Sequence, residues 1–138
     1  MHTVAKVLLK NADNELLLLR RSKTHPHSAY HLDLPGGEVE DGENAATAIV
    51  REVREETGIA IDERNLTMLF EEQADNHHYI LYSGTVDNDV AITLSWEHDQ
   101  FSWLTLQELL DWQPPTEPDN YHKMLIRALT ATPKSSPQ

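Results

Sequence analysis

The segment over residues 43–57 lacks proline and glycine and is rich in alanine, glutamate and arginine, all of which favour helices. Gly58 stands directly behind it, where a helix-terminating residue is expected. We therefore predict a helix that ends at residue 57. Because strand-like patterns lie on both sides of this helix, the chain is restricted to a mixed β-sheet with helices packed on it, an α+β fold.

Seven strands are predicted from short apolar runs that are bounded by turn-forming residues. Residues 11–14 and 87–89 are polar and predict hairpin turns, and Gly36 with Gly37 predicts a bend that needs unusual backbone freedom. The strands are predicted over residues 4–9, 16–19, 31–34, 66–72, 78–86, 90–95 and 101–104, with an exposed loop over residues 22–31.

Two further helices are predicted near the C-terminus. Thr105 and Glu108 have the spacing of a capping box, so a short helix is expected to begin there and to end before the following pair of prolines. Asp119 is expected to cap a final helix. The length of 138 residues predicts one domain, over residues 1–132, followed by a flexible tail over residues 133–138.

Charge balance and the absence of cysteine exclude several classes of function. The chain has 11 Lys and Arg against 23 Asp and Glu, a formal net charge of −12. Such a surface repels polyphosphate backbones, so binding of a nucleic acid polymer through a basic patch is not expected. With no cysteine, the chain has no disulfide, thiolate zinc site or cysteine nucleophile. A small phosphorylated ligand is compatible with this charge if metal cations bridge it to carboxylates.

No membrane or export segment is expected. The longest apolar run, residues 16–19, is far shorter than the roughly 20 residues that span a bilayer. The start of the chain lacks a basic segment followed by an apolar stretch. We therefore expect a cytoplasmic protein without a membrane partner, either a monomer or a homodimer.

Three glutamates share one face of the predicted helix. Glu55 lies at about −60° and Glu56 at about +40° from Glu52 on the helical wheel. Like charges at this spacing destabilise a helix by a few tenths of a kcal/mol per pair, and the macrodipole disfavours acids in the C-terminal half. A hard divalent cation with oxygen ligands would relieve both effects. Taken alone, however, a mixed Glu and Arg face is more often simply solvated.

Small and apolar residues adjoin the acidic face. Ala45 and Ala48 lie on it towards the N-terminus, so another segment or a ligand can approach the glutamates closely. Ile49 and Val53 belong to the neighbouring apolar arc, which would hold the helix against the sheet. The acidic face is then turned towards the glycine bend at residues 36–37 or towards solvent.

Spacing over a wider segment favours the metal-binding interpretation. Residues 37–59 read GEVEDGENAATAIVREVREETGI, which resembles the Nudix box: glycine, five residues, glutamate, seven residues, Arg-Glu, an aliphatic residue, any residue, Glu-Glu, any residue, glycine and an aliphatic residue. The resemblance to the Nudix hydrolase family, and to its MutT-like subgroup, implies an α/β/α sandwich with a mixed sheet. The required positions are filled by Gly37, Glu43, Arg51, Glu52, Val53, Glu55, Glu56, Gly58 and Ile59.

The resemblance implies hydrolysis of a nucleoside diphosphate linked to another group, with water attacking phosphorus. In the family, the glutamates that match Glu52, Glu55 and Glu56 bind Mg²⁺ or Mn²⁺, often with a carbonyl of the glycine bend, here Gly37 or the glycine before it. Arg51 would orient a neighbouring carboxylate, and the first glutamate of the box would be structural. The general base is assigned to the three glutamates as a cluster, because cations and carboxylates together position and activate the water.

Four residues outside the box complete the predicted site. Glu97 is a candidate for a further metal ligand or alternative base, although it also fits an ordinary loop carboxylate. Arg21 and Lys23 are candidates for phosphate contacts, and Asp33 for accepting a hydrogen bond from a base. The histidines of the loop over residues 22–31 lack a supporting carboxylate or cysteine pattern, so a histidine metal site is not expected.

Sequence markers favour a nucleoside triphosphate as the small-molecule substrate, cleaved to monophosphate and pyrophosphate. Residues 112–118 resemble the Pro-Pro loop that helps form the base pocket of MutT-type enzymes, although the asparagine that follows it there is missing. Ala74 stands where ADP-ribose hydrolases tend to have proline, and residues 75–77 stand where diadenosine polyphosphate hydrolases tend to have tyrosine. The alternatives are hydrolysis of those two substrates, a catalytically idle nucleotide sensor with this fold, and a purely structural interaction domain.

Overall fold

The computed structural model describes residues 2–26, 28–74, 76–118 and 120–130. The predicted cap at Asp119 and the predicted tail over residues 133–138 lie outside these ranges. The strands are β1 (His2–Lys10), β2 (Leu16–Arg21), β3 (Leu32–Asp33), β4 (Gly36–Glu38), β5 (Thr67–Ala74), β6 (His77–Thr85) and β7 (His98–Leu104). The helices are α1 (Ala45–Thr57), α2 (Leu106–Asp111), α3 (Asn120–Thr130) and the short 3-10 helix η1 (Glu63–Asn65).

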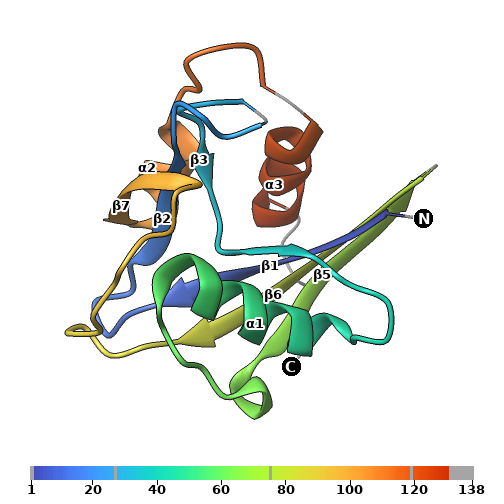
Figure 1. Ribbon diagram of the computed structural model, residues 1–138. Coiled ribbons are helices and arrows are strands. Elements are labelled where there is room, and N and C mark those ends of the chain that lie inside the picture. The colour runs from blue at the N-terminus through green and yellow to red at the C-terminus, as the bar shows by residue number, and fades with distance from the viewer. Residues whose placement is uncertain (1, 27, 75, 119, 131–138) are drawn as a thin grey trace, which may run out of the picture.

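The strands form a mixed sheet, which confirms the predicted fold class. Their order is β3-β2-β1-β6-β5, with β4 paired to β1 and β7 paired to β2. β1 and β6 run parallel, whereas the other pairs are antiparallel. Figure 1 shows α1 in front of β1 and β6, with α3 beside β3 in the upper part of the view. None of the helices in the described ranges is long and apolar enough to cross a membrane.

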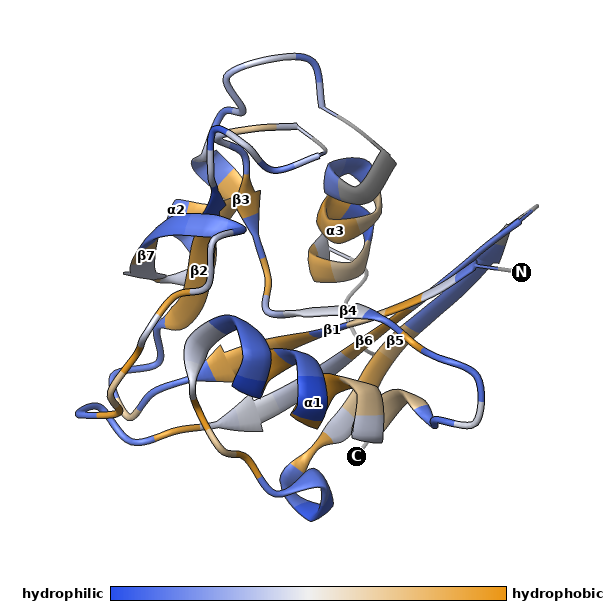
Figure 2. Cartoon of the chain, viewed as in Figure 1, coloured by the Kyte–Doolittle hydropathy of each residue, from blue (hydrophilic) through white to orange (hydrophobic). Residues whose placement is uncertain are grey.

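Alternate residues of β1 supply two hydrophobic cores, one on each face of the sheet. Ala5, Val7 and Leu9 pack with Ile49 and Val53 of α1. Burial of each of these two α1 side chains contributes roughly 1.5–3 kcal/mol. In Figure 2, β2 and the adjoining end of β1 are coloured hydrophobic, whereas much of α1 is hydrophilic. The second core involves α2 and α3 and contains Leu8, Leu16, Leu18, Leu34, Leu81, Leu109 and Leu125.

Local signals set both ends of α1. The helix begins at Ala45, two residues later than predicted, because the Asn44 side chain accepts a hydrogen bond from the Thr47 backbone N–H at 2.9 Å and caps it. Gly58 ends the helix in the left-handed conformation, with φ of 77°, and its N–H donates to the Arg54 carbonyl at 2.9 Å. The predicted terminator is therefore confirmed.

The predicted strand over residues 90–95 is wrong. This segment belongs to no strand or helix, and its backbone bonds to the C-terminal end of α1 instead of to another strand. The Thr93 N–H donates to the Thr57 carbonyl at 2.8 Å, and the Ser95 N–H donates to the Glu56 carbonyl at 3.1 Å. Carbonyls in the last turn of a helix lack partners within the helix, so the segment satisfies them and fixes the end of α1.

Gly36 allows β4 to approach β1 closely. Its φ is 129°, and a Cβ atom there would lie 2.2 Å from the Ala5 carbonyl oxygen. We expect Gly36→Ala to lower the free energy of unfolding by at least about 2 kcal/mol, because neither backbone can move away. Urea denaturation would measure the loss. Gly42→Ala is the matched control, since Gly42 also has a positive φ of 86° but open space around its Cβ position; an equal loss in both variants would contradict the steric explanation.

Candidate active site

A cavity of about 780 Å³ lies between β1, β4, β6 and α1 and the loop that follows β2. This size is typical of small-molecule sites. Its lining combines three chemistries: acids, cations and aromatic rings. The lining acids are Asp33, Glu38, Glu52, Glu56 and Glu97, the cations are Lys6 and Arg21, and the rings include His2, His25, His77 and Tyr79.

Glu56 is the more deeply buried of the two α1 glutamates in this cavity, with 5% of its surface exposed. Its Oε1 accepts a hydrogen bond from the Gly36 backbone N–H at 3.0 Å. Burial raises the pKa of Glu56 to about 8, although Lys6 and the Gly36 hydrogen bond act in the opposite direction. The ionised form of a buried carboxyl group is unfavourable without sufficient positive charge beside it. Glu56 is therefore better suited to binding a cation than to a purely structural role.

Glu52 lies against the glycine bend, as the sequence predicts for the acidic face. A Cβ atom on Gly37 would lie 2.7 Å from the carboxyl carbon of Glu52, so a larger residue there would displace this carboxyl group. Burial raises the pKa of Glu52, while a hydrogen bond from Arg51 Nη1 to Glu52 Oε2 at 3.0 Å lowers it. The bend thus brings two carboxyl groups of α1 to one stretch of backbone.

Arg51 connects α1 to β4 and to the loop before the helix. Its Nε and Nη2 donate to the Glu43 carboxylate at 2.7 and 2.9 Å, and Nη2 also donates to the Glu38 carbonyl at 3.0 Å. These contacts raise the pKa of Arg51 and lower that of Glu43 to about 2. Arg51 Nη1 lies 3.4 Å from Glu55 Oε1, but the Glu55 side chain is 60% exposed. Arg51 is therefore held where it orients Glu52.

Glu43→Gln is expected to alter the acid dependence of stability. Because the pKa of Glu43 falls from 4.5 to about 2 in the folded state, its ionised form stabilises the fold above about pH 4.5. This contribution is lost as the pH falls from about 4.5 to about 2, and the glutamine variant lacks it throughout. The Tm difference between wild type and variant, followed by circular dichroism, should therefore be largest above pH 4.5 and vanish near pH 2. A difference independent of pH would contradict the assignment.

The three glutamates predicted to share a metal site differ in their position relative to the cavity. Glu52 and Glu56 line the cavity, whereas Glu55 does not. Within the described ranges, the three do not have ligand oxygens all within 4.8 Å of one another. The donor set nevertheless fits Mg²⁺ or Mn²⁺, because hard carboxylate oxygens stand beside a glycine backbone with no Cβ in the way.

Asp33 is at the centre of a buried charged network. Lys6 Nζ donates to Asp33 Oδ1 at 3.1 Å, His98 Nε2 lies 3.1 Å from Oδ2, and Arg21 Nε lies 3.5 Å from Oδ2. Lys6 Nζ also donates to two carbonyls, one of them that of Gly36 at 3.0 Å. Burial alone would raise the pKa of Asp33, but its three partners outweigh burial and hold this pKa well below its usual range.

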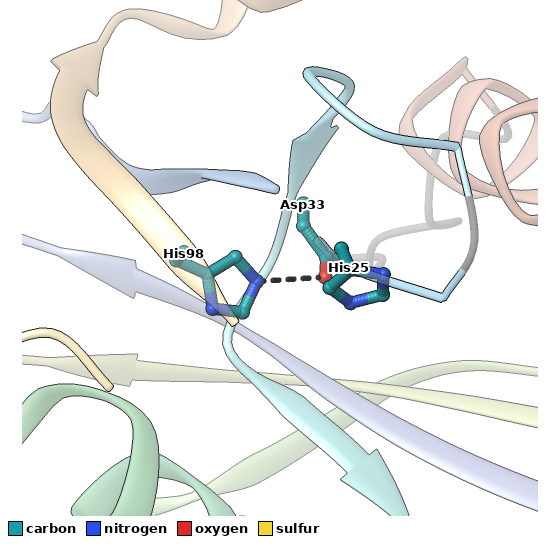
Figure 3. Close-up of side chains that lie close together, drawn as sticks. All are labelled: His25, Asp33 and His98. Atoms are coloured by element: carbon teal, nitrogen blue, oxygen red, sulfur yellow. Dashed lines mark hydrogen bonds and ion pairs between the residues drawn. The ribbon is translucent and has the colours of Figure 1, made fainter. Parts of the chain in front are cut away.

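Two histidines flank Asp33, as Figure 3 shows. One ligand atom each of His25, Asp33 and His98 lies within 4.8 Å of the others, a spacing compatible with a transition metal. The surrounding charge opposes such a site, because Lys6 and Arg21 already compensate the carboxylate and a divalent ion would add to two buried cations. We therefore interpret the group as an anchor for Asp33.

The other predicted site residues differ in position. Arg21 is buried and lines the cavity, as does Glu97, whose backbone carbonyl accepts a hydrogen bond from the Ser22 N–H at 2.8 Å. Lys23 is exposed and does not line the cavity. Asp33 also lines the cavity, and the buried network contacts both of its oxygens; its role as acceptor of a hydrogen bond from a base stays a prediction.

Sequence reasoning missed Lys6 and the rings of His77 and Tyr79 as cavity residues. The sequence feature that could have indicated Lys6 is a charged residue within an otherwise apolar strand. Conversely, none of residues 112–118, the loop predicted to help form a base pocket, lines this cavity. That loop contacts His31 instead, whose Nε2 lies 2.7 Å from a threonine hydroxyl of the loop.

Known proteins resemble this chain in both sequence and structure. The family model described as NUDIX domain matches residues 1–127. The 8-oxo-dGTP diphosphatase of Escherichia coli is 31% identical over 117 residues, covering 83% of this chain and 90% of the relative. The asymmetrical bis(5'-nucleosyl)-tetraphosphatase of Mus musculus is 33% identical over 115 residues, covering 78% and 74%. The crystal structure of the MutT protein from Methanosarcina mazei Go1 matches with a TM-score of 0.69 at 27% identity, covering 92% and 91%.

The mixed sheet, the glycine bend and the glutamates of α1, together with these matches, define a pyrophosphohydrolase. The chain belongs to the Nudix hydrolase family and is of the MutT-like type. The α/β/α sandwich implied by the Nudix box is thereby confirmed.

Proposed function

We propose that this protein is a Mg²⁺- or Mn²⁺-dependent hydrolase that cleaves a nucleoside triphosphate to monophosphate and pyrophosphate in the cytoplasm. The observation that carries the proposal is the placement of Glu52 and Glu56 against Gly36 and Gly37, inside a cavity of about 780 Å³. A small nucleotide is thus the expected partner of the site.

Glu52, Glu56 and the Gly37 carbonyl are the proposed metal ligands, with Glu55 and Glu97 as additional carboxylates. The Gly36 carbonyl accepts a hydrogen bond from Lys6, which favours Gly37 as the carbonyl ligand. A divalent ion bound there supplies charge neutralisation at the anhydride oxygens and lowers the pKa of a water molecule.

The protein's own residues then position the reaction. Arg21 is proposed to contact the phosphates, and Arg51 orients Glu52 through the 3.0 Å hydrogen bond. As water attacks phosphorus at the α–β anhydride, a new P–O bond forms and the anhydride P–O bond breaks. The leaving group, pyrophosphate or the nucleoside monophosphate, takes up the electron pair. A carboxylate of the cluster accepts the proton of the attacking water. The cluster contains Glu52, Glu55, Glu56 and Glu97, and the proposal does not select among them.

A substrate panel tests this proposal. Wild-type protein with Mg²⁺ would be assayed against nucleoside triphosphates, dinucleoside polyphosphates, ADP-ribose and nucleotide sugars, with detection of phosphate and pyrophosphate. We expect the highest kcat/KM for a nucleoside triphosphate, with pyrophosphate as a product. A higher value for ADP-ribose or a dinucleoside polyphosphate would replace the substrate class. Binding without turnover of any member would instead favour the idle nucleotide sensor.

A further inference from the structure

Lys6 is a cation of the cavity, but the chain itself occupies its ammonium group. Nζ donates to Asp33 Oδ1 at 3.1 Å, to the Leu34 carbonyl at 3.1 Å and to the Gly36 carbonyl at 3.0 Å. A lysine ammonium has three N–H donors, and these three acceptors match them in number. Lys6 is also buried, with 8% of its surface exposed. A hydrogen bond from Lys6 to a substrate phosphate would therefore have to replace one of these contacts.

Two of the three acceptors are carbonyls at the glycine bend. Gly36 is held on both sides, because its carbonyl accepts from Lys6 and its N–H donates to Glu56 Oε1 at 3.0 Å. The carbonyl of Pro35, the preceding residue, accepts a hydrogen bond from the Val7 N–H at 3.0 Å. Glycine has more backbone freedom than any other residue, so a bend with two adjacent glycines depends on such bonds to keep one conformation.

We propose that Lys6 is a positioning residue of the metal site. Its ammonium group fixes the Gly36 carbonyl, and with it the peptide plane that joins Gly36 to Gly37, beside the carboxyl groups of Glu52 and Glu56. This role rests on the proposed function, in which these two glutamates and the Gly37 carbonyl hold a divalent ion. Lys6 thus acts through the bend and does not contact the substrate.

The charge of Lys6 gives the expected effect an informative direction. A cation in the same cavity repels a divalent ion, so charge repulsion alone predicts that loss of the ammonium group strengthens metal binding. Loss of the hydrogen bonds to the bend predicts weaker metal binding instead. The direction of the change in metal affinity therefore separates positioning from charge repulsion.

Chemical replacement of Lys6 isolates the contribution of the ammonium group. The chain contains no cysteine, so Lys6→Cys introduces a single thiol, which can be alkylated in urea before refolding. Alkylation with 2-bromoethylamine gives a side chain of lysine length that ends in an ammonium group. Alkylation with 1-bromopropane gives an equally long side chain that ends in a methyl group. The aminoethyl and propyl forms fill nearly the same volume, and circular dichroism would verify that both refold.

The first measurement follows the bend without any metal. Hydrogen exchange of the Gly36 amide, measured by NMR, should be faster in the propyl form than in the aminoethyl form. Val53 in the interior of α1 supplies the reference amide. The acceleration at Gly36 should exceed that at Val53 at least about tenfold, because local opening of the bend adds to any global loss of stability.

The second measurement follows the metal and the substrate. The Kd of Mn²⁺, measured by electron paramagnetic resonance, should be about 10- to 100-fold higher in the propyl form than in the aminoethyl form, the usual effect of losing a group that orients metal ligands. At saturating Mg²⁺, KM for the best substrate of the panel should differ less than about threefold between the two forms, since Lys6 does not contact the substrate.

The competing explanations predict different results. Direct binding of phosphate by Lys6 would raise KM of the propyl form about tenfold or more at saturating Mg²⁺ and leave the Kd of Mn²⁺ unchanged or lower. That outcome would overturn the positioning role, as would equal Gly36 exchange and equal Mn²⁺ affinity in the two forms while the wild type binds Mn²⁺. Failure of the wild type to bind Mn²⁺ would overturn the proposed metal site, and the role of Lys6 with it.

Discussion

Glu56→Gln is expected to lower kcat for nucleotide hydrolysis by about 10²- to 10³-fold, the effect of losing several kcal/mol of electrostatic stabilisation of the transition state. Glutamine keeps the shape of the side chain, and its carbonyl oxygen can still accept the hydrogen bond from the Gly36 N–H that lies 3.0 Å from Oε1 in the wild type. The variant loses only the charge that a divalent cation requires. Steady-state kinetics with Mg²⁺ on the best substrate of the panel would measure the change.

The stability of Glu56→Gln should be unchanged or slightly higher, because burial already raises the pKa of Glu56 to about 8 and an amide has no charge to desolvate. Thermal unfolding of the variant would confirm this. Glu63→Gln is a matched control, since Glu63 is an exposed acid of η1 that does not line the cavity. Retained turnover in Glu56→Gln, or an equal loss in Glu63→Gln, would remove Glu56 from the catalytic cluster.

Local interactions explain why α1 and its surroundings could be predicted from the sequence. Asn44 and Gly58 cap the helix within its own neighbourhood, and the capping box of Thr105 and Glu108 likewise forms between residues three apart. The spacing of the residues also predicted an acidic face turned towards the glycine bend or towards solvent, and the structure places Glu52 and Glu56 at the bend. These features depend on contacts between residues that are only a few positions apart in the sequence.

Long-range contacts explain what could not be predicted. The segment over residues 90–95 has the composition of a strand, but the free carbonyls of α1 attract its backbone. Similarly, Lys6 and Asp33 are 27 positions apart, and His98 and Asp33 are 65 positions apart. No pattern in a short window indicates such pairs, so the buried network around Asp33 could not be predicted from the sequence.

Asp33→Asn is expected to lower the free energy of unfolding by about 3–5 kcal/mol, the cost of removing one partner from a buried ion pair. Asparagine can still accept one hydrogen bond, but Lys6 and Arg21 then lose the buried negative charge that lies beside both of them. Both are close to the aspartate, with Lys6 Nζ 3.1 Å and Arg21 Nε 3.5 Å from its oxygens. Urea denaturation at neutral pH would measure the change.

The exposed ion pair between Arg20 and Asp99 is a matched control for the buried ion pairs of Asp33. Arg20 pairs with Asp99 at 2.9 Å, but both side chains are more than one-third exposed, so Asp99→Asn should cost no more than about 1 kcal/mol. If burial is the cause, removing the charge of Lys6 should restore part of the stability, so the double variant Lys6→Met with Asp33→Asn should unfold at a higher urea concentration than Asp33→Asn alone. Equal losses in the two single aspartate variants would show that the buried network contributes no more than a surface ion pair.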